Sequence, residues 1–118
     1  MDIYIFLQLL ADDVTRMNAE EVDRIFFVRI AEDVKHVLKL ARSNGKTVSM
    51  RGTKHSMGGH TIAKNGYVID MEKLNHVMYD SETNTVRVGP GALWSSIIFK
   101  LNKFGLSLKT LQSYSTFR

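Results

Sequence analysis

The first half of the chain has the apolar spacing of a strand, a helix and a second strand. Residues 24–28 are mostly β-branched or aromatic, which is typical of a strand. Apolar side chains then recur at the i, i+3, i+4 and i+7 positions of an amphipathic helix over about residues 31–43, and Asn44-Gly45 is a typical helix end. A strand over residues 46–50 follows, so this spacing predicts a right-handed βαβ crossover.

The second half of the chain predicts shorter elements. Residues 67–71 form an apolar run that indicates a further strand. Two short runs, 77–79 and 85–88, flank five polar residues, and this arrangement predicts a hairpin. After a Gly-Pro-Gly break, we expect a second helix over about residues 92–103 and a last short strand over 106–108. The expected fold is α+β: a small βαβ unit with an added antiparallel hairpin and a second helix.

Length and composition limit the classes of protein to consider. A chain of 118 residues forms one domain at most. Its 16 basic and 12 acidic residues leave a net charge of +4, which favours anionic ligands weakly, and the basic residues are too dispersed to indicate a nucleic-acid partner. The absence of cysteine excludes disulfides and thiolate metal sites. The histidines and acidic residues do not form a zinc-ligand motif, so we predict no metal site.

An apolar run over residues 3–11 opens the chain. It is far shorter than a bilayer-spanning helix, and Asp2 precedes it where a signal peptide would carry basic residues. We therefore expect no membrane partner and a cytoplasmic location, with residues 1–12 as an apolar extension of a domain over 13–118. This extension is expected to be a packing segment or a partner-facing helix, and a homo-oligomer formed through it is one alternative.

The loop after the second predicted strand combines glycines, basic residues and a His-Ser pair. Its candidate binding residues are Arg51, Gly52, Thr53, Lys54, His55, Ser56, Met57, Gly58 and Gly59. Glycines leave room for a ligand to approach the backbone, and successive N–H groups can form a concave nest for phosphate oxygens. The loop therefore predicts a phosphate-bearing cofactor held by main-chain donors, and the alternative is an ordinary mobile glycine loop. Arg51 is expected either to bind phosphate or to pair with a carboxylate such as Asp70, with the structural pairing favoured.

The turn Pro90-Gly91-Ala92 is the second candidate contact. It precedes the second predicted helix, whose first N–H groups could meet an anion. The alternative is an ordinary strand-to-helix turn.

The string Gly52-Thr53-Lys54-His55-Ser56 resembles the flavin-binding loop of the FAD-linked oxidase superfamily, the vanillyl-alcohol oxidase or PCMH type. The motif is most similar to that of alditol, aldonolactone and cytokinin oxidoreductases, and similar patterns extend over roughly residues 13–117. The resemblance implies that the loop cradles the FAD pyrophosphate and that the turn 90–92 lies near the flavin. It also implies that His55 is the candidate for covalent attachment to the flavin 8α-methyl group in the complete protein, and it leaves open whether this chain alone carries FAD. Three residues depart from the family pattern: Val28 replaces a proline, Ile30 a Ser or Thr helix cap, and Lys54 a glycine.

The resemblance also implies a function. The chain would be the amino-terminal FAD-binding subdomain of an oxidoreductase that oxidises an alcohol, lactone or amine by hydride transfer to flavin. A second flavin subdomain and a substrate domain do not fit into 118 residues, so we expect no catalytic residue here and no activity of this chain alone. One alternative is a stand-alone or self-associating interaction module that kept the fold and lost the cofactor, and another is a nucleotide-phosphate binder without redox activity.

Overall fold

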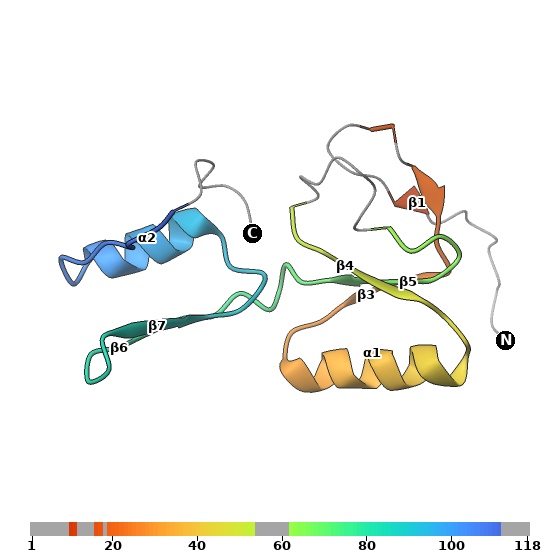
Figure 1. Ribbon diagram of the computed structural model, residues 1–118, viewed down its shortest axis with the longest axis horizontal. Helices are drawn as coiled ribbons and strands as arrows, with labels where there is room; N and C mark the ends of the chain where they lie inside the picture. The colour runs from red at the N-terminus through yellow and green to blue at the C-terminus, as the bar shows by residue number, and fades with distance from the viewer. Residues whose placement is uncertain (1–9, 12–15, 18, 54–61, 112–118) are drawn as a thin grey trace, which may run out of the picture.

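The computed structural model describes residues 10–11, 16–17, 19–53 and 62–111, and these form two groups of elements that lie next to each other along the longest axis (Figure 1). One group is a parallel sheet with a helix, and the other is a hairpin with a helix. In chain order the elements are β1 (Leu10–Ala11), β2 (Glu20–Glu21), β3 (Arg24–Phe27), α1 (Ala31–Ser43), β4 (Val48–Arg51), β5 (Tyr67–Asp70), β6 (Val77–Asp80), β7 (Thr85–Val88) and α2 (Trp94–Asn102).

The parallel sheet is the centre of the first group. Its strand order is β3-β5-β4, so the later strand β5 lies between the two strands of the βαβ unit. Phe27 of β3 and Arg51 of β4 are both in register with Asp70 of β5. All four residues of β5 are buried, because this strand has a neighbour on each side and a covered face above and below.

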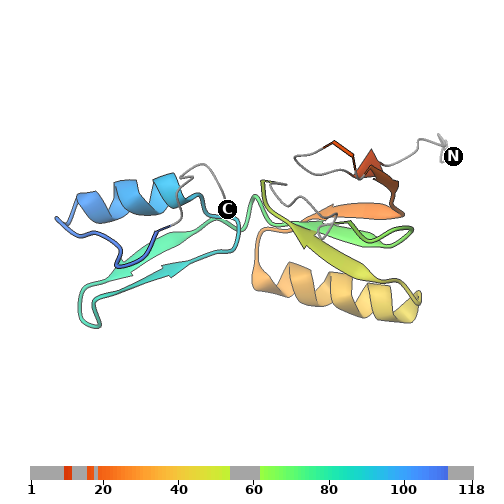
Figure 2. The ribbon, with the colours of Figure 1, turned by 45° about the horizontal axis from the view of Figure 1, so that its top comes forward.

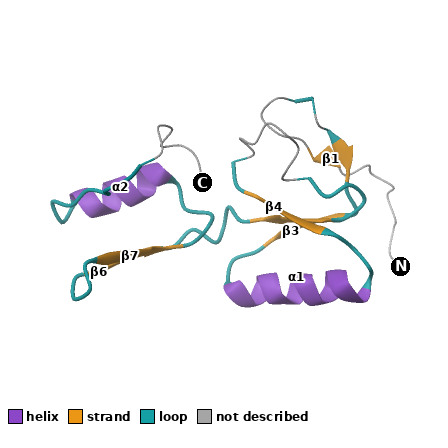
Figure 3. Ribbon diagram, in the orientation of Figure 1, coloured by secondary structure: helices purple, strands orange, loops and turns teal. Residues whose placement is uncertain are grey.

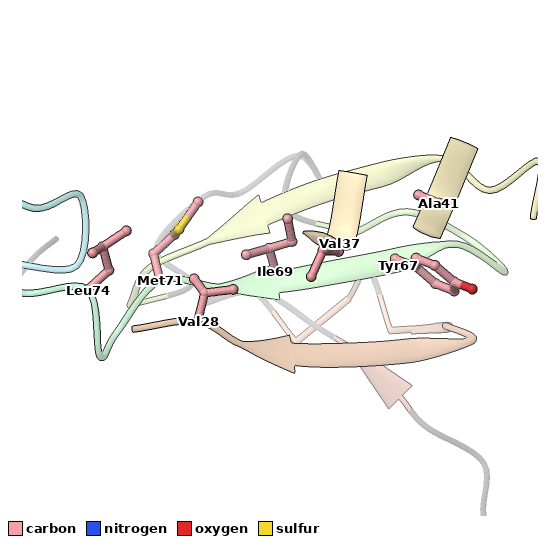
Figure 4. Close-up of a cluster of buried hydrophobic side chains, with 7 residues drawn as sticks. All are labelled: Val28, Val37, Ala41, Tyr67, Ile69, Met71 and Leu74. Carbon is pink, nitrogen blue, oxygen red and sulfur yellow. The ribbon is translucent and has the colours of Figure 1, made fainter. Parts of the chain in front are cut away.

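The two faces of this sheet are covered by different segments. Helix α1 covers one face, and the close-up in Figure 4 shows the apolar side chains gathered there. They are Val28, Val37, Ala41, Tyr67, Ile69, Met71 and Leu74. On the opposite face, Val68 packs with Ala11 and Val22, next to the short β1–β2 pair (Figure 2). The alternation of side chains along β5 therefore supplies both cores.

The carboxyl end of α1 is closed by backbone hydrogen bonds. The N–H of Lys46 donates to the carbonyl of Ala41 at 2.8 Å, and that of Gly45 donates to Arg42 at 3.3 Å. This pattern requires a left-handed residue after the helix, and Gly45 supplies it with a φ of +63°. The predicted helix end at Asn44-Gly45 is confirmed.

The amino end of α1 lacks a side-chain cap, because Ile30 occupies the cap position and has no acceptor. Asp33, one turn into the helix, replaces it. Its Oδ2 accepts hydrogen bonds from the N–H groups of Arg29 at 2.9 Å and Ile30 at 3.2 Å. These two bonds are the main reason why the pKa of Asp33 lies below its ordinary value.

The second group is a hairpin covered by a helix, as the secondary-structure colouring in Figure 3 shows. β6 and β7 pair antiparallel, with Val77 opposite Val88. The core between hairpin and helix contains Ala92, Ile97 and Leu101, and partly buried side chains from both strands pack against it.

The α+β fold class and both helices are confirmed, with two differences from the expected elements. The strand expected over residues 106–108 is wrong: this segment is assigned to no strand. Leu106 and Leu108 both pack against the α2 core. This packing accounts for the alternation of apolar and polar residues without hydrogen bonds to a neighbouring strand. The pair β1–β2 was not predicted, because two-residue strands carry no periodic signal.

The Asp33 bonds give a pH-dependent stability. A carboxyl whose pKa is lowered by folding stabilises the fold above its unfolded pKa of about 4, and this stabilisation is lost as pH falls through the lower folded value. We expect Asp33→Asn to lower the melting temperature at pH 7, and the difference from wild type should shrink towards zero as the pH falls to the folded pKa. Thermal unfolding followed by circular dichroism between pH 7 and pH 2 measures this.

The neighbouring variant Glu32→Gln is the matched control. Glu32 pairs with Lys35 at 2.7 Å, but both side chains are more than 60% exposed, at 62% and 65%. Exposed pairs contribute little, so the melting temperature should change by much less than in Asp33→Asn. A difference between wild type and Asp33→Asn that is the same at every pH would contradict the role given to the Asp33 carboxylate.

Candidate functional site

The candidate loop begins at the carboxyl edge of the parallel sheet. Because β3, β4 and β5 are parallel and in register, their last residues meet at one edge. In open parallel sheets, ligands bind outside this edge. Gly52 and Thr53 continue directly from β4 at this edge and are partly buried. The described start of the loop therefore lies where the topology favours a ligand.

A buried ion pair fixes the ends of the two strands. Nε of Arg51 donates to Oδ2 of Asp70 at 2.7 Å, and the two side chains are only 9% and 4% exposed. The second oxygen, Oδ1, accepts the N–H of Glu72 at 3.0 Å. The N–H of Met71 donates to the carbonyl of Arg51, also at 3.0 Å. Arg51 was expected either to bind phosphate or to pair with a carboxylate, and in the structure it pairs with Asp70.

The turn Pro90-Gly91-Ala92 packs against the chain that leaves β5. The N–H of Gly91 donates to the carbonyl of Leu74 at 2.9 Å. A Cβ built on Gly91 would overlap the carbonyl oxygen of Met71 and lie 2.9 Å from that of Glu72. Only glycine allows this approach of two backbones, so the turn is held next to the residues that follow β5.

Met71 connects the two candidate segments. Its N–H is bonded to Arg51, where the loop starts, and its carbonyl oxygen lies against Gly91. The structure thus brings the flank of the loop and the turn 90–92 to the same segment, although they are far apart in the sequence.

The amino end of α2, which follows the turn, carries no negative charge that would repel an anion. Its cap residue, Leu93, has no side-chain acceptor, and the first turn of α2 contains no acidic residue. The positive end of the helix dipole is therefore not neutralised by a local carboxylate. Asp70, at the sheet edge, is neutralised by Arg51.

The turn itself offers an anion no further main-chain donor, because Pro90 has no N–H, the N–H of Gly91 donates to Leu74 and that of Ala92 donates to Gly89. The donors that fit an anion here are the first amides of α2.

The side of the turn near α2 is different in character. Pro90 and Ala92 border an apolar hollow of about 300 Å³, which Val86, Trp94 and Leu108 also line. This hollow contains no charged side chain, so it does not fit a phosphate group. Ala92, Trp94 and Leu108 also belong to the apolar core of the second group, so the hollow is continuous with that core.

The middle of the loop lies outside the described residues. This applies to Lys54, His55, Ser56, Met57, Gly58 and Gly59, so their contacts with a cofactor stay predictions, as does covalent attachment at His55. His36 and His76, which were not assigned a ligand role, are described and exposed. Among the described residues, no group of three acidic or histidine side chains could hold a metal ion.

Sequence reasoning missed the parts of this site that are made by backbone atoms. The carbonyl groups of Met71 and Leu74 carry no side-chain signal. The glycines on either side of Pro90 indicated a break in the strand, but the sequence did not show which segment they contact. In the part of the chain that the structure describes, neither helix is long and apolar enough to cross a bilayer.

The replacement of glycine 91 tests the backbone contact. Because an added Cβ would overlap a carbonyl oxygen, Gly91→Ala should reduce the free energy of unfolding by about 3 kcal/mol, the upper end of the usual range for overpacking. Chemical denaturation of the purified chain measures the loss. Pro90→Ala, on the exposed neighbouring residue, is the control and should cost no more than about 1 kcal/mol. Equal losses in the two variants would show that the close approach is unimportant.

Comparison with known sequences identifies a family and several relatives. A family model described as an FAD binding domain matches residues 22–117. Cytokinin dehydrogenase 1 from Arabidopsis thaliana is 34% identical over 88 residues, which are 72% of this chain and 15% of that protein. L-gulonolactone oxidase from Bos taurus is 36% identical over 85 residues, or 71% of this chain and 19% of the oxidase.

Solved structures of oxidases have a similar fold. 6-Hydroxy-D-nicotine oxidase from Arthrobacter nicotinovorans superposes with a TM-score of 0.64 at 27% identity, over 69% of this chain and 18% of the oxidase. Cholesterol oxidase from B. sterolicum has a TM-score of 0.77 over 94% of this chain and 22% of the oxidase, and its 20% identity supports the fold alone. The chain spans 15% and 19% of the lengths of the two curated relatives.

Proposed function

Because this chain belongs to the FAD binding domain family, whose cofactor is FAD, we propose that it is the amino-terminal FAD-binding part of a flavin-dependent oxidoreductase. The complete enzyme would oxidise an alcohol, a lactone or an amine by hydride transfer to the flavin. The observation that carries the proposal is the meeting of two candidate segments, the loop that starts at Arg51 and the turn at Gly91, at the carboxyl edge of the parallel sheet.

The residues of this chain would hold the diphosphate of FAD. The glycine loop, from Gly52 to Gly59, would supply main-chain N–H donors, and the turn 90–92 would close the other side. The lack of acidic residues in the first turn of α2 supports this assignment, since a carboxylate there would repel the diphosphate. FAD supplies the redox chemistry, and this part of the protein supplies binding and orientation.

The imidazole of His55 is the proposed site of flavin attachment. The family motif in this chain has its histidine at this place. The neutral imidazole nitrogen would add to the 8α carbon of an oxidised flavin whose methyl group has lost a proton, so that a C–N bond replaces a C–H bond. The flavin would take up two electrons in this step and would be reoxidised by the electron acceptor of the enzyme, such as O₂. Attachment would prevent loss of the cofactor.

The substrate site is proposed to lie outside this chain. The chain spans less than a fifth of the two curated relatives, and no residue in it is assigned a catalytic role. We therefore expect that it binds FAD but does not react with substrate when purified alone.

Titration with FAD tests the proposed function. Purified chain should quench the fluorescence of added FAD and should carry the flavin absorbance bands through gel filtration, because the diphosphate contacts are within this chain. ADP, which has the diphosphate without the flavin, should compete. Candidate alcohols, lactones and amines should leave the bands of the bound flavin unchanged.

The opposite results have clear meanings. A folded chain that binds neither FAD nor ADP is not an FAD-binding part, and the interaction module without cofactor then explains it better. Exposed apolar residues on α2 and after it, such as Phe99 at 67% and Phe104 at 54%, would be the place to look for its partner. Substrate-dependent bleaching of the flavin would contradict the expected inactivity.

The attachment site has a separate test. After incubation with FAD and precipitation with acid, part of the flavin should remain with the wild-type protein, whereas His55→Ala should release all of it. His55→Ala should still bind FAD reversibly, because main-chain donors hold the diphosphate. His36→Ala, which changes an exposed histidine on α1, should behave like wild type. Retention of flavin by the acid-treated His55→Ala protein would exclude His55 as the attachment site.

A further inference from the structure

We infer that Asp70 is a positioning residue: its carboxylate holds the start of the glycine loop and the turn at Gly91 in the relative position that FAD binding requires. The inference rests on the proposed function. It assigns to Asp70 no contact with the cofactor, only an action through Arg51 and through the backbone that follows β5.

The two oxygens of this carboxylate hold two different segments. Oδ2 accepts from Nε of Arg51 at 2.7 Å, and Arg51 is the last residue of β4 before the loop. Oδ1 accepts from the N–H of Glu72 at 3.0 Å, on the segment that leaves β5. One buried group thus fixes the exit directions of two neighbouring strands.

Met71 transmits this constraint to the second candidate segment. It lies between Asp70 and Glu72, its N–H is bonded to the carbonyl of Arg51, and its own carbonyl oxygen is in close contact with Gly91. A change in the backbone at residues 71–72 must therefore move the turn at Gly91 or open this contact. The loop and the turn are coupled through one short stretch of chain.

Stability alone is a weak reason for this ion pair. Removing two charges from water has a large cost, and a buried pair is often no more stabilising than well-packed apolar residues of similar size. The other three positions of β5 are occupied by Tyr67, Val68 and Ile69, all buried. What the carboxylate adds is a fixed geometry, because it accepts two hydrogen bonds and so defines the positions of both donors.

A direct role of Arg51 predicts the opposite result. If the guanidinium bound the phosphate itself, Asp70 would compete for it, and removal of the Asp70 charge would strengthen FAD binding. If Asp70 positions the two segments, its removal weakens binding. The sign of the change therefore separates the two roles.

The first experiment compares FAD affinity with stability in the full 118-residue chain. Asp70→Asn should raise the Kd for FAD at least tenfold at a temperature at which thermal unfolding shows that the variant is folded. Ile69→Val, the adjacent buried residue on β5, is the matched control: it should lower the melting temperature and leave the Kd unchanged. An unchanged or lower Kd in folded Asp70→Asn overturns the inference.

A double variant covers the case in which Asp70→Asn does not fold. Arg51→Met with Asp70→Leu replaces the pair by apolar side chains of similar size and should keep a melting temperature close to that of wild type. The Kd for FAD should still rise at least tenfold, since the directional bonds are lost. Recovery of both stability and affinity in this variant would mean that the pair is only a packing element.

Amide hydrogen exchange separates a failure of this inference from a failure of the proposed function. Loss of the Asp70 bonds should speed exchange at amides next to both segments. On the loop side this is Met71, whose N–H donates to Arg51, and on the other side Gly91 and Ala92, whose N–H groups donate to Leu74 and Gly89. Ile69→Val should not do so. This measurement needs no cofactor: if the wild-type chain does not bind FAD, the proposed function fails, and the exchange rates still decide whether Asp70 couples the two segments. Faster exchange in only one segment overturns the coupling.

Discussion

The pairing of β5 between β3 and β4 is the constraint on which the first half of this structure depends. A strand with parallel neighbours on both sides has covered edges and covered faces, and all four of its residues are buried. Tyr67 and Ile69 must then meet α1, while Val68 meets Ala11 and Val22 on the other face. The same pairing places the last residues of three strands at one edge. The location of the site is therefore a consequence of how the core is built.

Close backbone contacts determine how the hairpin group is attached to this sheet. Gly66 packs against Thr47 just before β5, and Gly89 and Gly91 pack against Leu74 and Met71 after it. At each position a side chain would collide with backbone atoms, so the chain crosses itself at places where only glycine fits. The contacts of Gly89 and Gly91 hold the turn against the segment that leaves β5.

The sequence was a good guide to the elements that have a strong period. The i, i+3, i+4 spacing from Val34 to Ala41 predicted α1 with its observed limits, and the polar residues 80–84 indicated the hairpin connection. Apolar and polar residues alternate over 106–108 as in a strand. Leu106 and Leu108 nevertheless pack on the α2 core without pairing with another strand. The order β3-β5-β4 was not predictable from local patterns, because a strand inserted between two others leaves no local signal.

The candidate site was predictable to the extent that side chains make it. The motif around Gly52 and the pairing of Arg51 with Asp70 were both suggested by residue type, since a buried arginine needs a carboxylate. The carbonyl of Met71 and the N–H of Glu72 are no less important to the geometry, but every residue has such groups. Their role follows only from the crossing of the backbone at Gly91.

The buried pair also determines how charge is distributed at the sheet edge. An unpaired Asp70 carboxylate close to a diphosphate would oppose binding, and an unpaired Arg51 would attract any anion without regard to its shape. Joined at 2.7 Å, the two charges largely cancel outside the pair. On the proposed function, selectivity for a dinucleotide then comes from the arrangement of main-chain donors. That arrangement is useful only if the strand ends are held in place, which is the role inferred for the Asp70 carboxylate and its two hydrogen bonds.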